Sequence, residues 1–64
     1  MRDFQTEIDS TEDISRLMTI LAELNDTIEH LLGMSFEGDA AQKQAEALEL
    51  ILRYGEHKLD RLMD

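Results

Sequence analysis

Two histidines each follow a glutamate, as Glu29-His30 and Glu56-His57, a pairing that suggests a metal site or an acid–base pair. Adjacent residues on a helix diverge by about 100°, so neither glutamate converges on its histidine. The Glu-x-x-His and His-x-x-x-His spacings of di-iron and zinc helices do not occur. We therefore expect no metal, no cofactor and no catalytic set, and we predict that the protein is not an enzyme.

Two further kinds of chemistry are excluded by residue type. The chain has no cysteine, so it forms neither disulfides nor thiolate metal sites. Gly33 and Gly38 flank a short link without the Gly-Lys-Ser/Thr sequence of a phosphate-binding loop.

A chain of 64 residues buries a small core when it folds alone. Self-association is the remaining way to enlarge that core, and we expect a homodimer.

The charge balance bears on partners. Fifteen acids against six Lys and Arg give a formal net charge of −9. Nucleic acids and anionic lipids are held chiefly by Lys and Arg, so this charge disfavours both and favours a protein partner with a basic surface. The sequence shows no apolar stretch of transmembrane length and no signal peptide, so we expect a cytoplasmic protein without membrane contact.

The clearest pattern is a heptad repeat of apolar residues at a/d spacing: Ile14, Leu17, Leu21, Leu24, Ile28 and Leu31. It predicts a helix over residues 11–32, capped by Ser10 or Thr11 and ended by Gly33. A second seam predicts a helix over residues 39–63: Ala41, Ala45, Leu48, Leu52, Gly55, Leu59 and Leu62. The short link over 33–38 predicts an antiparallel hairpin.

The fold expected for residues 10–64 is thus all-α, a two-helix hairpin that dimerises into a four-helix bundle. Gly55 lies inside the second seam, where glycine costs about 1 kcal/mol relative to alanine. We interpret it as the site where a large side chain, Leu17 or an aromatic from another chain, packs closely. Residues 1–9 are expected to form an acidic, partly flexible arm. The alternative is that Phe4 and Ile8, four apart, make a helical turn that packs on the bundle or a partner.

The function predicted is that of a small protein-interaction module that regulates or inhibits a partner. The second helix carries an apolar patch besides its seam, which includes Leu50, Ile51 and Tyr54. It serves either as a subunit interface or as a partner site. Met34 and Phe36 in the link, and Phe4 in the arm, are further candidate contacts, since aromatic and methionine side chains are common in binding hot spots.

Two alternatives use charge instead. The first helix has acids off its seam that could imitate nucleic acid and block a nucleic-acid-binding protein, as phage-type inhibitors do: Glu12, Asp13, Glu23, Asp26 and Glu29. Arg53, His57 and Arg61 recur every four residues and form a possible anion-binding stripe. A dimer with this stripe would be similar in size and layout to Rop, a four-helix dimer that binds RNA, although no sequence motif is shared.

Overall fold

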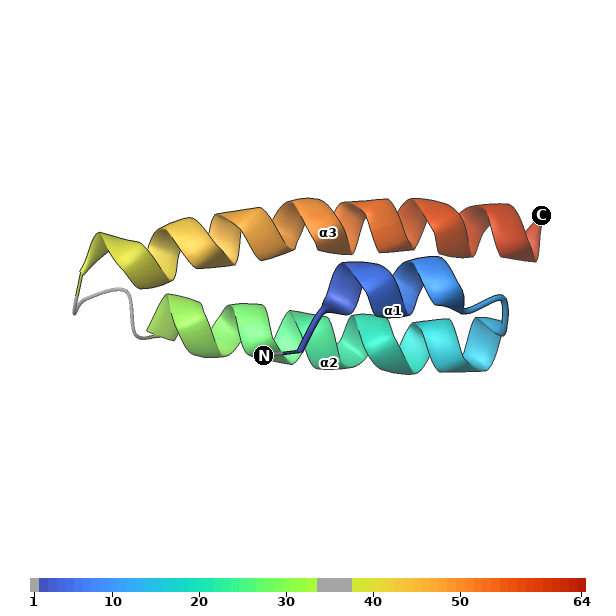
Figure 1. Ribbon diagram of the computed structural model, residues 1–64, viewed down its shortest axis with the longest axis horizontal. Coiled ribbons are helices and arrows are strands. Elements are labelled where there is room, and N and C mark those ends of the chain that lie inside the picture. The colour runs from blue at the N-terminus through green and yellow to red at the C-terminus, as the bar shows by residue number, and fades with distance from the viewer. Residues whose placement is uncertain (1, 34–37) are drawn as a thin grey trace.

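The computed structural model describes residues 2–33 and 38–64, and every regular element in those ranges is a helix. The helices are α1 (Phe4–Ser10), α2 (Ile14–Gly33) and α3 (Asp39–Met63). Helices α2 and α3 lie side by side and run in opposite directions, and α1 packs against both near the C-terminal end of α3 (Figure 1). The all-α prediction is confirmed, and the bounds of α3 agree with the predicted range.

The expected hairpin of two helices is incomplete, because the N-terminal arm folds into a third helix. Asp3 begins α1: its Oδ1 accepts a hydrogen bond from the Thr6 amide at 3.2 Å, and the Thr6 hydroxyl donates to Oδ2 at 2.7 Å. Phe4 and Ile8 then point to the same side and are 6% and 0% exposed. In the structure the arm thus has the packed helical turn of the alternative interpretation.

The start of α2 also differs from the prediction. Asp13, and neither Ser10 nor Thr11, caps it: the Asp13 Oδ1 accepts from the Arg16 amide at 3.2 Å, and the Asp13 carbonyl accepts from the Leu17 amide at 2.9 Å. Ser10 is the last residue of α1. Thr11 is buried in the link between α1 and α2, where its hydroxyl accepts from the Asp13 amide at 3.4 Å.

The core follows the predicted seam of α2 and extends beyond it. Leu17 and Leu24 are fully buried, Leu21 and Ile28 nearly so, whereas Ile14 at the start of the seam is 37% exposed. The other core members come from outside that seam: Phe4, Ile8, Ile20 and Ala45. Larger residues of the α3 seam, including Leu48, Leu52 and Leu59, are partly buried against this cluster. The single chain thus encloses more apolar surface than two helices alone would.

Gly55 is buried on α3, and its lack of a side chain has a packing reason. A Cβ built there would overlap Cδ2 of Leu21 and lie 3.0 Å from Cδ1 of Ile8. The close neighbours are therefore Leu21 on α2 and Ile8 on α1, and not Leu17 or an aromatic from another chain. Gly55 lets α1 approach α3 closely enough for Ile8 to reach the core.

Among the described residues, no helix is both long and apolar enough to cross a membrane.

Candidate interaction surface on the third helix

The side chains of Leu50 and Tyr54 lie on the surface of α3 and are 66% and 47% exposed. Ile51, the third member of the predicted patch, is partly buried against the core. Together with Gln5 of α1, these three residues line a shallow depression of about 280 Å³. Large apolar side chains with this exposure lose contact with water when a partner covers them, which makes this surface the leading candidate for an interaction.

Helix α1 fixes one border of that surface. The Tyr54 hydroxyl donates a hydrogen bond to Oδ1 of Asp9, which belongs to the last turn of α1. This bond, with a smaller effect of desolvation, raises the pKa of Tyr54 above its ordinary value. The phenol ring is thereby held in one orientation, with its hydroxyl directed at α1.

Lys58 of α3 binds the same end of α1. Its Nζ donates to the backbone carbonyls of Ile8 and Asp9 at 2.7 and 3.1 Å, and Oε1 of Glu12 lies 3.6 Å away. Carbonyls in the last turn of a helix lack helical partners and carry partial negative charge, so a lysine there stabilises the helix end. The Lys58 ammonium group is thus turned inward to α1, whereas Arg53, His57 and Arg61 of the same helix are exposed.

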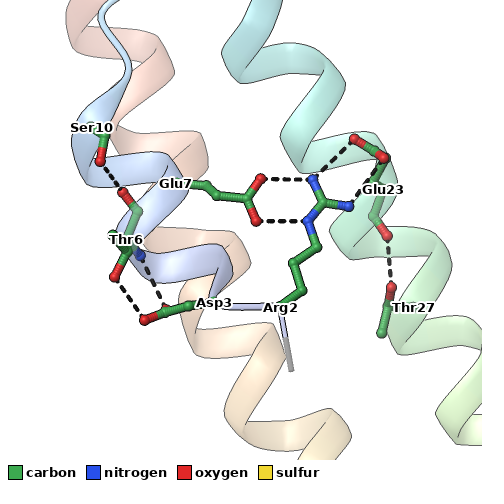
Figure 2. Close-up of polar contacts among 7 residues, drawn as sticks. All are labelled: Arg2, Asp3, Thr6, Glu7, Ser10, Glu23 and Thr27. Atoms are coloured by element: carbon green, nitrogen blue, oxygen red, sulfur yellow. Dashed lines mark hydrogen bonds and ion pairs between the residues drawn. The ribbon is translucent and has the colours of Figure 1, made fainter.

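Arg2 fixes the other end of α1. Its guanidinium makes two hydrogen bonds to Glu7, at 2.7 and 2.8 Å, and two to Glu23 of α2, both at 3.1 Å (Figure 2). The guanidinium carbon also lies 4.4 Å from the centre of the Phe4 ring. These contacts lower the pKa values of both glutamates and raise that of Arg2. The result is an ionic link, which we call the Arg2 clamp, between α1 and the middle of α2.

The predicted acidic face is divided by these contacts. Glu23 is paired with Arg2, and the Asp13 carboxylate caps α2. Glu12 lies near Lys58 with a side chain that is 76% exposed. Asp26 and Glu29 are exposed on α2. Part of the surface needed for mimicry of nucleic acid therefore has a structural use inside the chain.

The predicted basic stripe is exposed but mixed with acids. Arg53, His57 and Arg61 all lie on the solvent side of α3. His57 and Arg61 border a hollow of about 320 Å³. Its lining includes both acidic and basic side chains: Asp9, Glu12, Tyr54, His57, Lys58, Arg61 and Leu62. This arrangement does not concentrate positive charge in the way that a polyanion site requires.

Of the other predicted partner contacts, one is buried and two lie outside the described part of the chain. Phe4 is buried in the core under the Arg2 guanidinium, so its ring is not presented to a partner. Met34 and Phe36 lie outside the described residues. Within 2–33 and 38–64, no group of three or more His, Asp or Glu side chains is placed to hold a metal ion.

Other exposed apolar side chains are more scattered. Ile14 and Met18 lie one turn apart near the start of α2, and Met63 is the last residue of α3. Leu32 is exposed at the far end of α2, and the polar Asn25 interrupts the heptad step from Met18 to Leu32. These residues do not form a continuous stripe along one helix.

The chain matches no known family model, no curated protein and no solved structure.

Proposed function

We propose that this protein is a non-enzymatic interaction module that binds another protein through the outer surface of α3 and thereby regulates or inhibits it. The observation that carries the proposal is the exposure of Leu50 and Tyr54 beside Gln5 of α1. The chain has enough apolar residues to make a core, and it places these two outside it.

The physical support is that the aromatic side chain on this surface is held in one orientation before a partner binds. Tyr54 is oriented by Asp9, and Ile51 is partly buried against the core. A preorganised aromatic side chain loses little conformational freedom on binding, so more of its apolar contact appears as affinity. Aromatic side chains in such positions are frequent centres of binding energy.

The test is a pair of matched substitutions. Leu50→Glu introduces a charge at the centre of the surface, and Met18→Glu introduces the same charge at another exposed apolar position, on α2. Proteins captured from cells by the wild-type chain are purified and their affinities for the three chains are measured. We expect a direct partner whose binding tolerates high salt, is lost with Leu50→Glu and is kept with Met18→Glu. Equal binding by the Leu50→Glu chain would refute the proposal.

A homodimer is the competing use of the same residues. Two copies joined through α3 would give a bundle of the kind that the heptad pattern predicts, and they would bury Leu50 and Tyr54. Light scattering during gel filtration, at low and high micromolar concentration, distinguishes the two uses. A stable dimer that Leu50→Glu converts to a monomer would assign this surface to self-association.

A further inference from the structure

Leu50 and Tyr54 are the centre of a longer stripe on α3. Stepping alternately by four and three residues gives Lys43, Ala47, Leu50, Tyr54, His57 and Arg61, and all six are exposed. This is the spacing with which one helix packs along another in a coiled coil. We call this stripe the outer seam, to distinguish it from the seam that α3 packs against α2. It spans about 27 Å at 1.5 Å per residue.

The outer seam has no acidic residue, although the chain has 15 acids against six Lys and Arg. Its middle is apolar, with Ala47, Leu50 and Tyr54, and its ends carry Lys43 on one side and His57 with Arg61 on the other. Neither Lys43 nor Arg61 forms an ion pair with any other residue in the described ranges. Both cationic groups are therefore available to a carboxylate from outside the chain.

A second copy of α3 does not complement this pattern. In an antiparallel pair centred on residue 52, Leu50 of one copy would face Tyr54 of the other, and Lys43 would face Arg61. In a parallel pair, Lys43 and Arg61 would each face their own equivalents. Both arrangements bring like charges together at the ends of the seam, and such contacts act against pairing.

Resting on the proposed function, we infer that the outer seam binds an amphipathic helix of another protein, apolar at its centre and bearing a carboxylate at each end of its contacting stripe. The net charge of the chain alone favoured a partner with a basic surface. The exposed seam indicates the opposite sign at the contact itself. Glu46 and Asp60, exposed beside the seam, provide places where basic residues on the flanks of that helix would pair.

Two synthetic peptides test the inference directly. Both are helices of three heptads with leucine at the central contacting positions. One has glutamate and the other lysine at the two ends of the contacting stripe, with the opposite residues on the outer face so that their net charges are equal. Their affinities for the full chain are measured by fluorescence anisotropy at moderate salt. We expect the glutamate-ended peptide to bind about tenfold more tightly, since each exposed charge pair contributes modestly.

Variants of the chain locate the contact. Changing Lys43→Glu together with Arg61→Glu should reverse the preference between the peptides. Arg53→Glu is the matched control, an exposed charge reversal on α3 outside the outer seam, and should leave the preference unchanged. Leu50→Glu should weaken both peptides by at least tenfold, because both require the apolar centre.

Each other outcome contradicts the inference in a recognisable way. Equal affinity for the two peptides, with loss of both in Leu50→Glu, would overturn the acidic partner and leave the proposed interaction surface standing. Binding of neither peptide, or binding that survives Leu50→Glu, would remove the helix-docking role of the outer seam. The proposed function would then depend on its own test with the captured partner. Peptide binding that competes with self-association would identify the occupant as a second copy.

Discussion

The two ends of the α2–α3 pair are built differently. At the end near the C-terminus of α3, α1 packs on the pair, and its Ile8 is buried together with Leu17 and Leu21 of α2. Toward residues 33 and 38 only two helices face each other: Ile28 and Ala45 are still buried there, but Leu31 is only partly buried and Leu32 is 43% exposed. A two-helix pair leaves more of its large side chains in contact with water, and a third helix, even one of seven residues, covers additional ones.

This difference implies that stability is concentrated where three helices meet. Ile8→Ala should lower the free energy of unfolding by about 2–4 kcal/mol, because it removes a fully buried side chain and leaves a cavity. Leu31→Ala, at the two-helix end, should cost about 1 kcal/mol, because its side chain is only partly buried. Urea unfolding followed by circular dichroism measures both. Equal losses would show that α1 adds nothing to the core.

Gly55→Ala tests the closest approach within the three-helix end. Alanine gains about 1 kcal/mol of helix propensity over glycine. Against this, the new methyl would overlap Leu21 Cδ2 and crowd Ile8 Cδ1, and overpacking of this kind costs about 1–3 kcal/mol. We expect a net loss of about 1 kcal/mol, measured by thermal or urea unfolding.

The control for Gly55→Ala is the same substitution in a Leu21→Ala background. There the new methyl enters space that Leu21 has vacated, so Gly55→Ala should raise the free energy of unfolding. A gain in the wild-type background as well would contradict the close packing of α1 on α3.

The Arg2 clamp should make the attachment of α1 depend on pH. Arg2 lowers the folded-state pKa values of Glu7 and Glu23, so its stabilisation is complete above the unfolded value of about 4.3 and is lost as the pH falls through the lowered values. We expect α1 to detach in acid before α2 and α3 separate. The NMR signal of the Ile8 δ-methyl, which reports its packing near Gly55, follows that step.

Arg2→Gln should loosen α1 at neutral pH and reduce the effect of acid on the Ile8 signal. Arg53→Gln is the matched control, since Arg53 is exposed on α3 and forms no ion pair with the residues that the structure describes. If the acid transition of the Ile8 signal were the same in all three chains, the clamp would not govern the attachment of α1.

The sequence predicted the two long helices better than it predicted α1. The seams of α2 and α3 were predictable because a helix of 20 residues or more repeats its apolar period several times. Helix α1 has two apolar contacts and no repeat, and a helix of that length is stable only through tertiary contacts. Its supports come from distant positions: Glu23, Gly55 and Lys58.

The candidate site was predictable in its apolar centre and not in its borders. The spacing of Leu50, Ile51 and Tyr54 indicated a second apolar face on the second helix. The border of that face depends on where α1 lies, because Gln5 of α1 lines the depression with Leu50 and Ile51, and Asp9 of α1 accepts the hydrogen bond of the Tyr54 hydroxyl. The four-residue spacing of Phe4 and Ile8 was a local signal for α1 in the sequence, and the Asp3-x-x-Thr6 cap was another.

The contact between Asp9 and Tyr54 provides the smallest and most local test of the three-helix end. The bond favours the neutral phenol, so it contributes stability below the ordinary pKa of Tyr54, and that contribution is lost as the pH rises through the raised folded-state pKa. Tyr54 is the single tyrosine and there is no tryptophan, so the ultraviolet absorbance of tyrosinate reports this one group. Asp9→Asn should move its titration to lower pH, because the acceptor loses its charge.

Glu12→Gln is the matched control for Asp9→Asn, because Glu12 borders the same hollow without bonding to Tyr54. It should change the titration of Tyr54 less than Asp9→Asn does. A titration that is unchanged by Asp9→Asn would mean that the end of α1 does not rest against α3. The outer seam would then lack the border that orients its aromatic residue, and the contrast between the two ends of the molecule would have to be explained by Ile8 and the Arg2 clamp alone.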